Sequence, residues 1–86
     1  MKHAGGAALD ALEPLLREVR TLPSLIEKKR GIFYRKSKAF LHFHEDEAGL
    51  FADIKLAGDR DYVRFRVSNA TECKVFLIAA KKAAAT

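Results

Sequence analysis

The sequence has 86 residues, of which 49% are apolar and 31% are charged. A chain of this length encloses one modest hydrophobic core, and this composition is typical of a folded domain rather than of a disordered segment. We therefore expect a single small domain over residues 1–86, with residues 1–6 disordered. The chain has one cysteine, which excludes an internal disulfide and a zinc site built from several thiolates.

The charge balance is basic, with 16 Lys and Arg residues against 11 Asp and Glu residues and a formal net charge of +5. Such a surface favours encounters with polyanions such as nucleic acid. Basic residues are concentrated in residues 28–38, which contain no acid, whereas residues 45–47 are all acidic. We interpret both segments as solvated loops at opposite ends of a sheet.

Nothing in the sequence resembles a membrane-targeting segment. The first ten residues are small but include charges, and no run of about 18 apolar residues occurs anywhere. We expect a cytoplasmic protein in a reducing compartment, with no membrane partner.

The first predicted element is a helix over residues 7–21, where apolar residues recur at helical spacing. Pro14 falls inside it, so we expect the helix either to begin near Glu13 or to bend there. Residues 24–30 then form a connection or a short edge strand.

Four strands are predicted next, at residues 32–35, 39–44, 50–56 and 62–67, because apolar and polar residues alternate there. Residues 36–38, the segment ending at Gly49, and residues 57–60 supply the turns. A final helix follows Asn69, which with Glu72 forms a capping-box pattern. The order predicts an α+β fold, in which two terminal helices pack on one face of a four-stranded antiparallel meander.

The two later hairpins fix a register that places His42 beside Asp53 and Asp53 beside Arg64. A slip of one residue would move a charged side chain into the core, where an unpaired charge is costly. One face of the sheet is then apolar, with Leu41, Phe43, Ala52, Ile54, Leu56, Val63, Phe65 and Val67. The opposite face carries Phe40, His42, His44, Phe51, Asp53, Lys55, Tyr62, Arg64 and Arg66, with Phe33 or Tyr34 added according to the first turn.

Aromatic rings interleaved with Lys and Arg are typical of platforms for single-stranded nucleic acid, where rings stack on bases and cations meet phosphates. Our leading hypothesis is that this face binds nucleic acid or another anionic partner. The alternative is that two copies stack these faces in a homodimer.

An enzyme is the least favoured class. His42, His44 and Asp53 form a weak candidate for a metal site or an acid–base pair, but no third ligand is identified and Arg64 lies close by. Cys73 falls on the apolar stripe of the last helix, so no nucleophile belongs to the face. We expect no catalytic residue and no cofactor.

The stretch from Lys38 to Asp46, followed by residues 49–55, resembles small uncharacterised bacterial proteins. More loosely, the helix–meander–helix order over residues 30–80 resembles the MmcQ/YjbR-like family. That resemblance implies an α+β fold and a suggested role in binding DNA, and it transfers no residue role.

Overall fold

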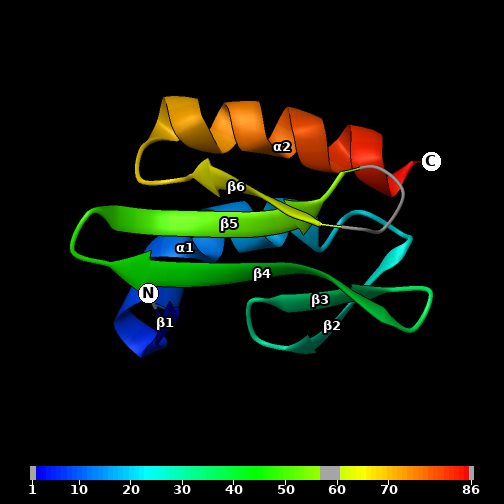
Figure 1. Cartoon of the computed structure of the whole chain (residues 1–86), viewed down its shortest axis with the longest axis horizontal. Coiled ribbons are helices and arrows are strands. Elements are labelled where there is room, and N and C mark those ends of the chain that lie inside the picture. The colour runs from blue at the N-terminus through cyan, green and yellow to red at the C-terminus, as the bar shows by residue number, and fades with distance from the viewer. Residues whose placement is uncertain (1, 57–60, 86) are drawn as a thin grey trace.

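The computed structural model describes residues 2–56 and 61–85 and has an α+β architecture (Figure 1). In chain order the elements are β1 (Lys2–His3), α1 (Gly6–Val19), β2 (Leu25–Lys29), β3 (Ile32–Arg35), β4 (Lys38–Asp46), β5 (Gly49–Lys55), β6 (Tyr62–Arg66) and α2 (Ala70–Ala84). Neither helix in the described part is long and apolar enough to cross a membrane.

The sheet has two more strands than the predicted four among the residues described. Its order is β2-β3-β4-β5-β6, all neighbours are antiparallel, and β1 pairs with β4 beside the end of β3. The edge strand β2 forms a hairpin with β3 that turns at Gly31, whose φ of 80° favours glycine.

Residues 1–6 were expected to be disordered, but the described part of this segment is held to β4. Lys2 pairs with Glu45 and His3 pairs with His44 in an antiparallel register. The backbone N–H of Ala4 donates to the Phe43 carbonyl at 3.0 Å. This strand satisfies backbone groups along the part of the β4 edge that β3 does not reach.

The registers predicted for the two later hairpins are confirmed. His42 pairs with Asp53 across β4 and β5, and Asp53 pairs with Arg64 across β5 and β6. Gly49 closes the first of these hairpins with a φ of 135°, as the turn prediction required. The predicted turn at residues 57–60 lies outside the described residues.

Both helices differ little from their predicted limits. Helix α1 begins at Gly6 and continues through Pro14 to Val19, so it does not start near Glu13. Helix α2 begins after Asn69, whose side chain accepts a hydrogen bond from the Glu72 N–H at 2.9 Å. The predicted cap of α2 is therefore confirmed.

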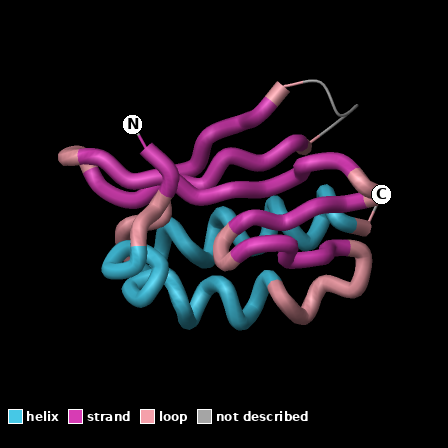
Figure 2. Tube along the Cα trace, turned by 90° about the horizontal axis from the view of Figure 1, so that it is seen from below, coloured by secondary structure: helices cyan, strands magenta, loops and turns pink. Residues whose placement is uncertain are grey.

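In Figure 2 both helices lie below the upper strands of the sheet, and two further strands lie at the level of the helices. The core lies between these layers, where Leu16, Val19, Leu41, Ile54 and Phe76 are completely buried. Val63 was expected in this core but is 42% exposed. It lies on β6, the last strand of the sheet, so no further described strand covers its outer side.

Phe40 was expected on the face away from the helices, but it is buried in the core with 2% exposure. The pairing of β3 with β4 shifts after Phe33, and Phe40 is the additional residue between Ala39 and Leu41. A bulge of this kind interrupts the alternation of side chains between the two faces. The prediction for Phe40 was therefore wrong.

Candidate functional site

The candidate site is the open face, by which we mean the side of the sheet opposite the helix-packed core. Strand pairing arranges its side chains in three rows. One row contains Lys55 and Tyr62, the next contains Ile32, His42, Asp53 and Arg64, and the last contains His3, His44, Phe51 and Arg66. Tyr34 lies on the same face, where it pairs with Ile26 and Ala39.

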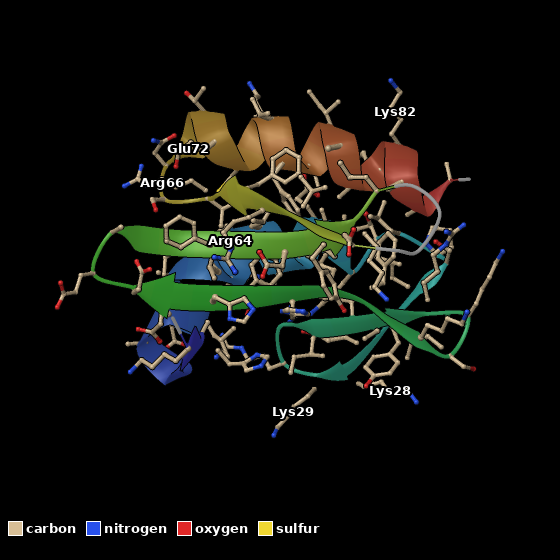
Figure 3. All side chains as sticks on the ribbon, viewed as in Figure 1. Lys28, Lys29, Arg64, Arg66, Glu72 and Lys82 are labelled. Carbon is tan, nitrogen blue, oxygen red and sulfur yellow. The ribbon has the colours of Figure 1, made fainter. Side chains whose placement is uncertain are left out.

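Asp53 and Arg64 form a bidentate ion pair at the centre of the open face. The Arg64 Nε–H and Nη2–H groups donate to the two Asp53 carboxylate oxygens at 2.7 and 2.8 Å. Asp53 is buried, whereas Arg64 remains half exposed, and Figure 3 shows Arg64 on the front of the sheet. The hydrogen bonds from Arg64 lower the pKa of Asp53, against an opposing effect of burial.

His42 and His44 lie on the same side of β4, as their spacing predicts, and their rings are in contact. His42 Nδ1 and His44 Nε2 are 2.6 Å apart, and His44 Nε2 is 3.4 Å from an Asp53 oxygen. Burial is the largest effect on both imidazoles and lowers the pKa of each, although the Asp53 charge acts in the opposite direction. Both rings are therefore biased toward the neutral form, which can bind a metal ion.

The structure adds His3 to this pair. Strand β1 places the His3 ring 4.7 Å from the His44 ring and 5.5 Å from the His42 ring, measured between centroids. His3 was not among the residues expected at this site, because residues 1–6 were expected to be disordered. A strand of two residues has no detectable alternation, so no local pattern identifies it.

Arg66 and Phe51 lie at the end of the open face nearest the turn between β4 and β5. Arg66 donates hydrogen bonds to the Ala48 carbonyl and to a Glu72 carboxylate oxygen, at 3.0 Å in each case. Figure 3 shows Arg66 beside Glu72. Phe51 is partly buried and lies between His44 and Arg66 in the strand pairing. Arg66 therefore links a hairpin turn to the first turn of α2.

The opposite end of the open face carries two tyrosines with a lysine over each ring. Lys28 Nζ is 4.9 Å from the centre of the Tyr34 ring, and Lys55 Nζ is 5.1 Å from the centre of the Tyr62 ring. Of the two residues left open by the first turn, Tyr34 belongs to the open face and Phe33 is buried. Burial raises the pKa of Tyr62, and the electrostatic effect of Tyr34 adds to it.

The basic segment 28–38 was expected to be one solvated loop, but most of it belongs to β2 and β3, with turns at Gly31 and at Lys36–Ser37. The basic turn between β3 and β4 is at the right of Figure 1, and the acidic turn between β4 and β5 is at the left. Tyr34 on β3 is thus close to the basic turn between β3 and β4.

Cys73 does not reach the open face. It packs against the core from α2, and burial raises the pKa of its thiol. It also lines an apolar groove of about 410 Å³ with residues of α1, including Leu12 and Leu15. No serine or cysteine on the described open face is placed to act as a nucleophile beside His42.

No protein-family model, curated protein or solved structure matches this chain. The resemblance to the MmcQ/YjbR-like family therefore stays a prediction.

Proposed function

We propose that the open face binds single-stranded nucleic acid through Tyr34 and Tyr62. The observation that carries this proposal is the pairing of each tyrosine with its own lysine, Lys28 or Lys55. Aromatic rings stack on bases of any sequence, and the adjacent cations neutralise the phosphates between the bases.

The exposure of these groups supports the same role. Tyr62 is 38% exposed, and the Arg64 side chain is half exposed despite its ion pair. A base that stacks on the Tyr62 ring displaces the Lys55 ammonium group from it. The ammonium group is then free to contact a neighbouring phosphate. The net charge of +5 favours the encounter at low ionic strength.

The proposal is tested by fluorescence anisotropy of a labelled single-stranded oligonucleotide across a salt series. Tyr62→Ala should weaken binding roughly tenfold, because stacking contributes about 1–3 kcal/mol per base. Lys55→Gln should also reduce the slope of log K against log salt by about 0.7, the value for one phosphate contact on a single strand.

Lys82→Gln is the matched control. Lys82 lies on α2, away from the open face, so this variant loses the same charge without losing a proposed contact (Figure 3). Equal effects of Lys55→Gln and Lys82→Gln would overturn the proposal, because binding would then depend on net charge alone. Absence of binding at low salt would also overturn it, and a stable dimer in light scattering with the tyrosines buried would support the homodimer instead.

A further inference from the structure

All three histidines of the chain lie in one cluster on the open face. The sequence contains only His3, His42 and His44, and one ring nitrogen from each lies within 4.8 Å of the others. They come from β1 and β4, which are separated by the whole of α1, β2 and β3 in the chain. The fold thus brings together residues that no local motif connects.

The backbone fixes the position of the histidine cluster. His3 pairs directly with His44 in the register of β1 with β4. After β1, the Gly5 N–H donates to a Glu45 carboxylate oxygen at 2.6 Å.

The spacing of the ring nitrogens is close to what a tetrahedral ion requires. Zinc–nitrogen bonds of about 2.0–2.1 Å at a tetrahedral angle place the ligand nitrogens about 3.4 Å apart. His42 Nδ1 and His44 Nε2 are closer than this, at 2.6 Å, while the His3 nitrogen lies within 4.8 Å of both. To bind one ion, the side chains would have to rotate so that the His42 and His44 nitrogens move apart and the His3 nitrogen approaches them.

The surroundings tolerate a cation. The Asp53 carboxylate lies 3.4 Å from His44 Nε2 and supplies a negative charge beside the cluster. Arg64 would repel an ion, but it forms a bidentate pair with Asp53, so the two charges together are close to neutral and the imidazoles have to provide the binding. His3 is exposed, so a water molecule can reach the fourth position of the ion.

We propose that His3, His42 and His44 bind one divalent transition-metal ion of the zinc class. Imidazole nitrogens favour Zn²⁺, Co²⁺, Ni²⁺ and Cu²⁺ over Mg²⁺ and Ca²⁺, which prefer oxygen ligands. Three protein ligands with an open fourth position also differ from a closed structural zinc site.

The test is calorimetric titration of chelator-treated protein with Zn²⁺, followed by the absorption spectrum of the Co²⁺ form. Zn²⁺ is the probe because Cu²⁺ can also bind the backbone amides next to a single histidine. We expect one ion per chain, with a tetrahedral Co²⁺ spectrum. His3→Gln, His42→Gln and His44→Gln should each reduce the affinity at least about tenfold.

Two controls keep the test decisive. Cys73→Ser should leave Zn²⁺ affinity unchanged, because Cys73 is on the helix side of the sheet. His3 is exposed, so His3→Gln removes a ligand without opening the core, even if a variant at His42 or His44 unfolds. Unchanged affinity in His3→Gln, or no Zn²⁺ binding at one ion per chain, would overturn the site.

The test of the histidine cluster does not depend on the proposed role of the tyrosines. The titration contains no oligonucleotide, and the anisotropy experiment is run with chelator present. Loss of either activity therefore leaves the other measurable.

Discussion

The variant Phe40→Ala tests whether Phe40 lies in the core, as in the structure, or on the open face, as the sequence predicted. Phe40 is 2% exposed and Tyr62 is 38% exposed, although both were expected to be stacking residues. Phe40→Ala should lower the free energy of unfolding by about 3–5 kcal/mol, because it removes a buried ring and leaves a cavity. Tyr62→Ala should cost about 1 kcal/mol, since it removes from a partly exposed ring only the contacts with His42 and Lys55.

These values are large relative to the stability of such a chain. At roughly 0.05–0.15 kcal/mol per residue, 86 residues give a total of about 4–13 kcal/mol. Chemical denaturation measures the difference, and Phe40→Ala should also lower the melting temperature by roughly 12 °C or more. If Phe40→Ala destabilises the protein no more than Tyr62→Ala, the placement of Phe40 in the core is wrong.

Two further predictions concern pH and the cap of α2. Burial lowers the pKa of His42 and His44 from the ordinary value of 6.5, so in metal-free protein the free energy of unfolding should fall as the pH drops below about 6.5. The unfolded chain then takes up protons that the folded state resists, and replacing both residues with Gln should flatten this part of a denaturation–pH profile. Asn69→Ala should cost about 1 kcal/mol by urea denaturation, with Asn69→Asp close to wild type, because only Ala leaves the Glu72 N–H without its cap. Equal losses in both Asn69 variants would contradict the capping role.

The hairpin registers could be predicted because the alternation of apolar and polar residues and the positions of the charged residues indicate the same register. A slip of one residue in either hairpin would put Asp53 or Arg64 into the core, and β4 and β5 keep a regular pairing along their length. The same reasoning placed Asp53 beside His42. The central row of the open face therefore followed from the sequence.

The remaining differences arise where pairing is irregular or very short. The bulge at Phe40 adds one residue to β4, and no proline or glycine at that point indicates it. The edge strand β2 exposes Ile26 at 63% and has a second irregularity after Glu27, so its alternation is weak. Strand β1 is only two residues long, and its position depends on the unpaired part of β4 rather than on its own sequence.

The histidine cluster and the tyrosines share one contact, because the ring centroids of His42 and Tyr62 are 4.5 Å apart. A bound divalent ion would add two positive charges beside the proposed base-stacking surface. At a separation on the order of 10 Å in water, those charges attract one phosphate by only about 0.8 kcal/mol, and physiological salt reduces this further. Long-range attraction therefore cannot raise oligonucleotide affinity more than roughly fourfold, and the oligonucleotide must raise Zn²⁺ affinity by the same factor. A larger mutual effect requires a phosphate oxygen to occupy the open fourth position of the ion, which would make the two sites one.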